Sequence, residues 1–167
     1  MALSQLLEDV VDPHRGFGVE IAVSATGHGQ EPIGSRNAAI RYGLGNLLEN
    51  AVDFAKTGVE VAATWDDKNV SISIRDDGSG FALEVLAKLG DPYVSVRSGK
   101  TARKQSGGGL GLGFFIAKTL LERTGAKLFL ENRAPPEHGA HIRVTWPRTA
   151  FESLGHMDGQ DFSLHKN

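Results

Sequence analysis

The chain has 167 residues, 40% of them hydrophobic and 23% charged, with a formal net charge of -2. These values are typical of one soluble globular domain with its own core, and they do not favour binding to nucleic acid. The absence of cysteine excludes disulfides, thiolate zinc sites and thiol chemistry, and the lack of a signal peptide or an apolar run of about eighteen residues predicts a cytoplasmic domain without direct membrane contact.

The first half of the chain predicts two helices and three strands. Residues 3–11, "LSQLLEDVV", have the spacing of a short amphipathic helix, and residues 18–25 alternate like a strand. Residues 35–58 predict one long helix, with a serine as its candidate N-cap and a glycine at its end. Two strands follow, at 59–65 and 69–76, and the polar turn "DDKN" joins them.

The second half predicts two helices and two strands. Residues 82–89 predict a short helix, residues 90–109 a polar loop with glycines and basic residues, and residues 110–124 a second helix. Strands are expected at 126–132 and 141–147. Because helices and strands mix without a regular βαβ rhythm, we predict an α+β fold: a two-layer α/β sandwich, with a mixed sheet of about five strands and about three helices on one face.

The first motif that carries chemistry is "NLLENAVDFA" on the long helix. Asn46 and Asn50 stand four residues apart, so their carboxamides share one face of the helix. Amide oxygens are suitable ligands for Mg²⁺, which usually keeps waters and substrate phosphates as its other ligands. Taken alone, the pair is more simply explained by solvated side chains or by hydrogen bonds between helices.

The second motif, "IRDDGSGF", begins where a predicted strand ends. Asp76 follows the strand directly, and Gly78 and Gly80 come next. A carboxylate at this place can accept a hydrogen bond from an exocyclic amine, and the glycines would let the backbone approach a flat ring. The alternative is an ordinary Asp-Gly turn that leaves a strand.

The third motif, "SGGGLGLGFF", places several glycines just before the predicted helix 110–124. The bare backbone N–H groups and the positive end of the helix dipole make a ready site for an anion. A flexible linker before a core helix is the alternative, and the leucines between the glycines make it less attractive.

In this order and at these separations, the three motifs resemble the N, G1 and G2 boxes of the catalytic ATP-binding domain of sensor histidine kinases. That domain has the Bergerat (GHKL) fold, which DNA gyrase, Hsp90 and MutL share. The resemblance covers about residues 18–147. Within the family, "RYGLGNLLENAVDFA", "DPYVSVRS" and "GGGLGLGFFIAKTLLERTGA" look most like the redox-responsive kinases RegB, PrrB and ActS.

The resemblance implies an enzyme domain that binds ATP and Mg²⁺. Asn50 would coordinate Mg²⁺, with Asn46 beside the metal and the phosphates. Asp76 would accept the adenine amino group, while Gly78 and Gly80 let the ring approach. The implied lid and phosphate contacts are a hydrophobic anchor, a cation and the glycine-rich cradle: Tyr93, Arg97, Gly107, Gly109, Leu110, Gly111 and Leu112.

Two positions depart from the family pattern. The family often has a lysine three residues after the metal-binding asparagine, whereas this chain has Asp53. That carboxylate would lie near the phosphates unless it faces away, so their charge must be balanced by Mg²⁺, Arg97 or the basic loop. The last strand of the family often begins with Gly-Thr, but here Ala140 follows the glycine, and a hydroxyl that could support the adenine site is missing. We therefore expect a modest affinity for ATP.

The histidines decide the expected reaction. None of the six lies in the acidic H-box string of a helical hairpin: His14, His28, His138, His141, His156 and His165. The resemblance therefore implies a module excised from a membrane-anchored sensor kinase, with no acid or base of its own identified. It would donate the γ-phosphoryl group to a histidine on a separate dimerisation domain, ahead of a response regulator.

The same resemblance divides the chain into three parts. We expect residues 1–17 to be a short helix and linker, left from the connection to the missing dimerisation hairpin. Residues 18–150 would be the ATP-binding kinase domain. Residues 151–167 would form a flexible tail, because they are polar and contain glycines.

Two other functions stay open. A hydrolytic ATPase of the gyrase or MutL kind carries a glutamate base four residues before the metal-binding asparagine. Here that position is Asn46, which cannot take a proton from water, and Glu49 points about 100° away from Asn50 around the helix. The second alternative is a nucleotide-binding scaffold without activity, which the departures at Asp53 and Ala140 keep open.

Overall fold

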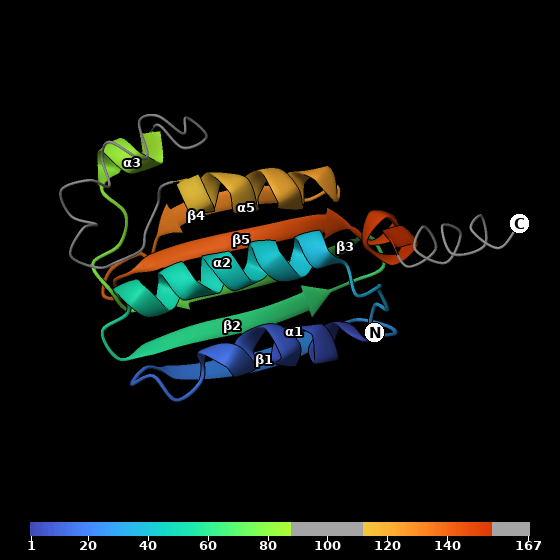
Figure 1. Ribbon diagram of the computed structural model, residues 1–167, viewed down its shortest axis with the longest axis horizontal. Helices are drawn as coiled ribbons and strands as arrows, with labels where there is room; N and C mark the ends of the chain where they lie inside the picture. Colours follow the sequence, from blue (N-terminus) through green and yellow to red (C-terminus); the bar gives the residue numbers. More distant parts are fainter. Residues whose placement is uncertain (88–111, 155–167) are drawn as a thin grey trace, which may run out of the picture.

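In the residues that the computed structural model describes, 1–87 and 112–154, five strands form one mixed sheet in the order β1-β2-β3-β5-β4 (Figure 1). The strands are β1 (Glu20–Gly27), β2 (Gly58–Trp65), β3 (Asn69–Asp76), β4 (Lys127–Asn132) and β5 (Ala140–Pro147). β1 runs parallel to β2, and the other neighbouring pairs are antiparallel. The predicted α+β fold with a mixed five-stranded sheet is confirmed.

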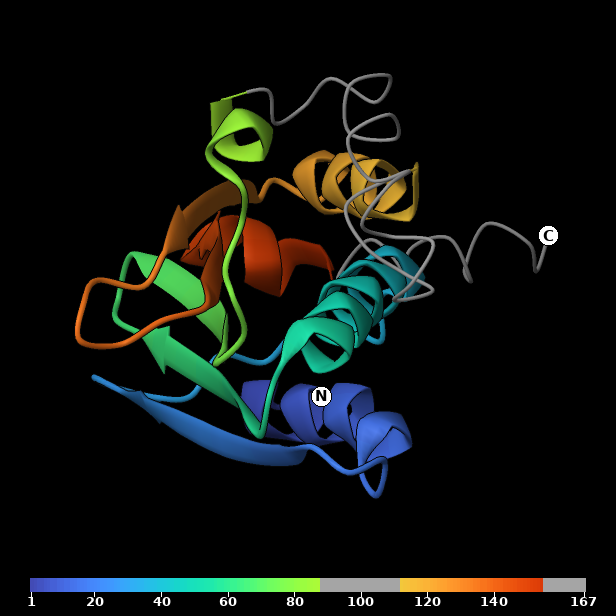
Figure 2. The same cartoon turned by 90° about the vertical axis from the view of Figure 1, so that its left-hand side faces the viewer.

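The helices are α1 (Leu3–Val11), α2 (Ala38–Phe54), α3 (Leu83–Ala87) and α5 (Leu112–Arg123), and a 3-10 turn, η1 (Asp12–His14), follows α1. Three of them, α1, α2 and α5, form the second layer (Figures 1 and 2). Figures 1 and 2 together show α1, α2 and α5 on one face of the sheet. The prediction of helices on a single face is therefore confirmed for these three.

Short-range chemistry explains two of the connections. Parallel neighbours need a crossover, and α2 provides it between β1 and β2. The antiparallel pair β2 and β3 needs only a tight turn. Its Asp66 carboxylate accepts hydrogen bonds from the backbone N–H groups of Lys68 and Asn69, both at 2.7 Å.

Helix α2 is shorter at both ends than the sequence predicts. It begins after Asn37, not after Ser35, because the Asn37 side chain accepts a hydrogen bond from the Ile40 backbone N–H at 3.1 Å and acts as the N-cap. It ends at Phe54, since Ala55 already has extended backbone angles and β2 begins at Gly58. The predicted helix over 35–58 is corrected to Ala38–Phe54.

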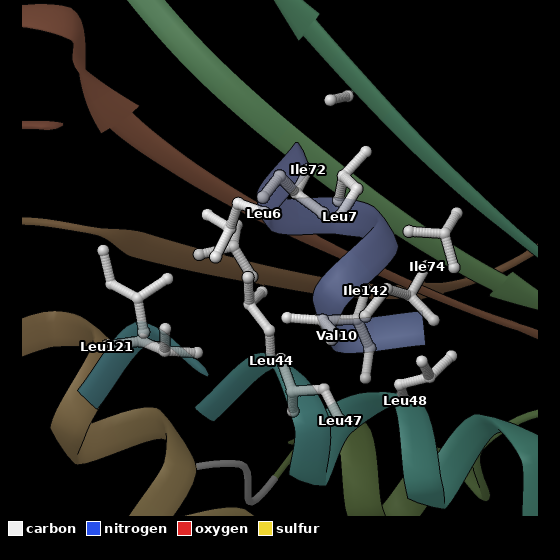
Figure 3. Close-up of a cluster of buried hydrophobic side chains, with 14 of the residues drawn as sticks. Leu6, Leu7, Val10, Leu44, Leu47, Leu48, Ile72, Ile74, Leu121 and Ile142 are labelled. Atoms are coloured by element: carbon white, nitrogen blue, oxygen red, sulfur yellow. The ribbon is translucent and has the colours of Figure 1, made fainter. Parts of the chain in front are cut away.

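The hydrophobic core lies between the sheet and the helical layer, as Figure 3 shows. The helices contribute their apolar stripes, and the strands contribute every second side chain. Labelled members of this core include Leu6, Leu7, Val10, Leu44, Leu47, Leu48, Ile72, Ile74, Leu121 and Ile142.

Helix α1 belongs to this core. The expectation that residues 1–17 are left from the connection to a dimerisation hairpin stays a prediction. All five of its large apolar side chains are buried: Leu3, Leu6, Leu7, Val10 and Val11. They pack toward α2 and β1 because the leucines and valines recur at helical spacing on one face. Residues 3–11 are therefore part of the folded unit.

The expected boundary at residue 150 falls inside a helical segment. Residues 148–154 are helical, and the buried ring of Phe151 meets Trp146 edge-on with the ring centroids 5.6 Å apart. Aromatic burial of this kind ties the segment to the core. The rest of the expected tail, 155–167, lies outside the described residues. Among the described helices, none combines the length and the apolar character that a membrane span requires.

Candidate functional site

Asp76 occupies the last inward position of strand β3. Val70, Ile72 and Ile74 point into the core before it, so the alternation of the strand turns the Asp76 side chain inward as well. The residue is only 3% exposed. Its Oδ1 accepts hydrogen bonds from the backbone N–H groups of Gly78 at 2.9 Å and Ala140 at 3.1 Å.

This carboxylate has an acceptor atom to spare. In the described part of the chain both hydrogen bonds of the Asp76 side chain go to Oδ1, and none goes to Oδ2. Burial raises the pKa of Asp76, although the two backbone N–H groups and the nearby Arg133 act in the opposite direction. A buried carboxylate with one unused oxygen is suited to a ligand that offers an N–H donor.

The Asp76 loop, residues 76–81, needs its two glycines for packing as well as for any ligand. A Cβ on Gly78 would lie 2.2 Å from the carbonyl oxygen of Phe54 at the end of α2. Gly80 has a φ of +83°, and a Cβ there would lie 2.7 Å from the Asn132 Oδ1 atom. The loop therefore sits directly against α2 on one side and β4 on the other.

Asp77 joins the Asp76 loop to the turn that follows α2. Its carboxylate accepts hydrogen bonds from the backbone N–H groups of Lys56 at 2.7 Å, Thr57 at 3.0 Å and Gly58 at 3.2 Å, and also from the Thr57 hydroxyl. Burial opposes its ionisation, but these hydrogen bonds outweigh burial and hold the pKa of Asp77 well below its usual range. This contact is not visible in the sequence pattern.

Asp77→Ala is expected to lower the free energy of unfolding by about 1–2 kcal/mol at pH 7, because three backbone N–H groups lose a charged acceptor. A depressed pKa in the folded state stabilises the fold above the ordinary value of 3.8, and this contribution is lost as the pH falls further. Urea unfolding should therefore show a smaller difference in the free energy of unfolding between wild type and Asp77→Ala at pH 3 than at pH 7. Asp67→Ala, at an exposed carboxylate in the β2–β3 turn, is the control. A difference in the free energy of unfolding that is equal at both pH values would contradict a stabilising role of the ionised Asp77 carboxylate.

Asn46 and Asn50 lie on α2 at the same end of the sandwich as the Asp76 loop. Asn50 is buried and Asn46 is half-buried. The first turn of α5 packs against this part of α2, since a Cβ on Gly113 would lie 3.2 Å from Asn46 Nδ2. Leu112, at the start of α5, is exposed. The C-terminal part of α2, the end of β3 and the start of α5 thus meet at the left end of Figure 1.

A divalent cation at this place would depend on amide oxygens. Among the described residues, no group of three or more histidine, cysteine, aspartate or glutamate side chains could hold a metal ion. Asn46 and Asn50 supply neutral oxygen donors, which suit Mg²⁺ when phosphates and waters complete its shell. The donor set therefore fits a metal that arrives together with a phosphate-bearing ligand.

The two departures from the family pattern have specific surroundings. Asp53 is largely exposed; the partial burial of its carboxyl group and the charge of Glu49 raise its pKa, while His14 on η1 lowers it. Asp53 thus lies near η1 and Glu49. Ala140 lacks a hydroxyl, yet its backbone N–H still binds Asp76, a contact that any residue except proline can make.

Part of the predicted site is outside the described residues: Tyr93, Arg97, Gly107, Gly109, Leu110 and Gly111. The described part also contains a residue that the sequence pattern does not predict. Arg133 donates from Nη1 to the Asp76 carbonyl oxygen at 3.1 Å. In the sequence it stands in "ENRAPPEHGA", which has only the composition of a polar turn.

Comparisons with known proteins agree with these features. Residues 35–150 match the family described as histidine kinase-, DNA gyrase B-, and HSP90-like ATPase. The sensor histidine kinase RegB of Cereibacter sphaeroides is 37% identical over 160 residues, which cover 87% of this chain and 35% of RegB. The sensor histidine kinase CssS of Bacillus subtilis is 30% identical over 105 residues, 63% of this chain and 21% of CssS. The chain thus spans well under half of these relatives.

Solved structures show the same fold. The mycobacterial sensor histidine kinase MprB superposes with a TM-score of 0.65 at 20% identity, over 88% of this chain and 95% of that one. A nucleotide-free catalytic domain of the histidine kinase ThkA superposes with a TM-score of 0.64 at 20% identity, over 89% of this chain and 94% of the other.

Proposed function

Because the chain belongs to the family of histidine kinase-, DNA gyrase B- and HSP90-like ATPases, we propose that it is the ATP-Mg²⁺-binding domain of a two-component sensor histidine kinase. In this role it donates the γ-phosphoryl group of ATP to a histidine on a separate dimerisation domain. A response regulator then receives the group from that histidine. The whole kinase is anchored in a membrane, with this domain on the cytoplasmic side.

The observation that carries the proposal is the buried Asp76 carboxylate with its unused oxygen. Adenine presents an exocyclic amine, which can donate to Asp76 Oδ2 while Oδ1 stays bound to the backbone of Gly78 and Ala140. Guanine presents a carbonyl oxygen at the corresponding place, and a second acceptor would face the carboxylate. The site therefore favours adenine over guanine.

The phosphates belong on the side of α2 and α5. The amide oxygens of Asn50 and Asn46 would hold Mg²⁺, which would neutralise phosphate charge when bound. Residues carried over from the resemblance complete the role: Tyr93 as lid anchor, Arg97 as phosphate contact, and Gly107, Gly109, Leu110, Gly111 and Leu112 around the triphosphate. This chain positions ATP and balances the charge of its phosphates, since the attacking nucleophile belongs to another domain.

Hydrolysis is the second candidate, and the described residues argue against it. Asn46 stands where hydrolytic relatives carry a glutamate base, and a carboxamide cannot accept a proton from water. Glu49 is exposed and its charge acts on Asp53, away from the inward-facing Asn50. Helix α2 therefore carries a carboxamide, not a carboxylate, at the position from which hydrolytic relatives activate water.

Phosphoryl transfer tests the proposal directly. The chain is incubated with γ-labelled ATP and Mg²⁺, alone and together with a dimerisation hairpin from a RegB-like kinase. We expect no label on the chain by itself, and a weak, acid-labile and base-stable label on the hairpin, because the tether that raises the local concentration is absent. The hairpin with its histidine changed to glutamine is the control.

Each other outcome of that experiment has one meaning. Label on this chain alone would place the acceptor histidine within it and contradict the donor role. ATP binding without transfer to the hairpin would favour the inactive scaffold. Rapid release of labelled phosphate without labelled protein would favour the hydrolytic ATPase.

A further inference from the structure

The connection between β4 and β5, residues 133–139, is hydrogen-bonded to the Asp76 loop through Arg133. The guanidinium is mostly buried, and its Nη1 donates to the Asp76 carbonyl oxygen at 3.1 Å. Its Nη2 donates to the Glu137 carboxylate at 3.0 Å, and the Arg133 backbone N–H donates to the Gly139 carbonyl oxygen at 2.9 Å. A planar guanidinium held at both ends has little freedom, so the Asp76 backbone is fixed with it.

Asn132, the last residue of β4, holds the other end of the loop. Its Oδ1 accepts from the Phe81 backbone N–H at 2.7 Å, and its Nδ2 donates to the Phe81 carbonyl oxygen at 2.9 Å. One side chain thus satisfies both backbone groups of Phe81, as a neighbouring strand would. Gly80 leaves the space for this contact, because a Cβ there would meet Asn132.

His138 contacts the middle of the loop. Its Nδ1 lies 3.0 Å from the Gly78 carbonyl oxygen, a hydrogen bond in which the ring N–H donates. Gly139, at a φ of +116°, lets the connection approach so closely that a Cβ would lie 1.9 Å from the Asp76 carbonyl oxygen. Each of three carbonyl oxygens in the loop therefore accepts a hydrogen bond from a side chain. Arg133 donates to Asp76, His138 to Gly78 and Asn132 to Phe81.

We propose that Asn132, Arg133 and His138 are positioning residues that set the base selectivity of the nucleotide site. They hold the Asp76 loop in one position, in which Asp76 Oδ2 can accept a hydrogen bond from the exocyclic amine of adenine. If the loop relaxes, the carboxylate can shift to accept from the ring N–H and the amino group of guanine, and selectivity falls. This inference rests on the proposed function, because it assumes that Asp76 binds the base.

The test compares ATP and GTP binding by calorimetry for the full chain and three variants. Arg133→Met and Asn132→Leu remove the contacts to Asp76 and Phe81. Arg143→Met is the matched control, because its guanidinium stacks over Phe129 on the open face of the sheet, 5.0 Å from the ring centroid. We expect the two positioning variants to lose about tenfold in ATP affinity and most of the ATP-over-GTP preference, and the control to keep both.

A second measurement does not need nucleotide. Backbone amide exchange of Phe81 and Gly78 in the free chain should become faster in Asn132→Leu and Arg133→Met, and stay unchanged in Arg143→Met. Asn132→Asp and Arg133→Lys, which keep most of the side-chain volume, replace any variant that fails to fold.

The outcomes separate the two ideas. Folded positioning variants that keep the wild-type ratio of ATP to GTP affinity would overturn the positioning role and leave the proposed function standing. A wild-type chain that binds neither nucleotide would overturn both. A merely structural role is recognised by lower melting temperatures with an unchanged ratio, and that result also overturns the inference.

Discussion

Asp76→Asn is expected to weaken ATP binding by about 5- to 150-fold, or about 1–3 kcal/mol, while leaving the chain at least as stable as wild type. The affinity falls because a carboxamide presents an NH₂ group where the carboxylate presents Oδ2, and two donors then face each other. Oδ1 of the asparagine can still accept from Gly78 and Ala140, so the loop keeps its hydrogen bonds.

The stability follows from the direction of the pKa shift. Burial raises the pKa of Asp76 in the folded chain above its ordinary value of 3.8. Above both pKa values the ionised group therefore costs folding free energy, and this cost disappears only when the pH falls low enough to protonate it. A neutral asparagine removes the cost at pH 7. The ionised Asp76 carboxylate thus lowers the free energy of unfolding but keeps an acceptor oxygen for a ligand.

Calorimetry with ATP and GTP, and thermal unfolding without nucleotide, measure the two effects separately. Wild type should prefer ATP, and Asp76→Asn should lose that preference at an equal or higher melting temperature. Equal affinity of the wild-type chain for ATP and GTP would contradict the proposal that Asp76 binds the base. A variant that loses affinity only because it unfolds would show a lower melting temperature instead.

The second large effect is expected from α1. Leu7 is 1% exposed, and Leu7→Ala should lower the free energy of unfolding by about 2–5 kcal/mol because the missing methyl groups leave a cavity. Removing residues 1–11 altogether should abolish cooperative unfolding, since five buried side chains are lost at once. Urea unfolding followed by circular dichroism measures both.

Leu83→Ala is the control, because Leu83 is 79% exposed on α3 and its loss should change the free energy of unfolding by less than about 0.5 kcal/mol. A shortened chain, 12–167, that still unfolds cooperatively with the wild-type midpoint would show that α1 is dispensable. That result would support the expected division at residue 17.

The sequence by itself determined the fold class, the family and most elements. Alternation placed β3 at residues 69–76 and β2 within one residue of its observed start, because the side chains of a strand take turns on its two faces. The helical spacing of residues 3–11 predicted α1 at its observed bounds. The spacing of the three motifs predicted the family, which is confirmed. The individual roles of Asn46, Asn50 and Asp76 stay predictions.

Only the tertiary structure decided which side chains hold the site together. Arg133 binds the carbonyl oxygen of Asp76 across 57 positions of sequence, and Asp77 binds the backbone of residues 56–58 across about twenty. Such contacts leave no periodic trace, because a single side chain in a turn meets backbone that the fold brings to it. The same reason explains the end of α2: the Ala55 N–H still donates to the Ala51 carbonyl oxygen, and from Lys56 onward the Asp77 carboxylate accepts the backbone N–H groups. Local pattern predicts elements, and packing decides where they meet.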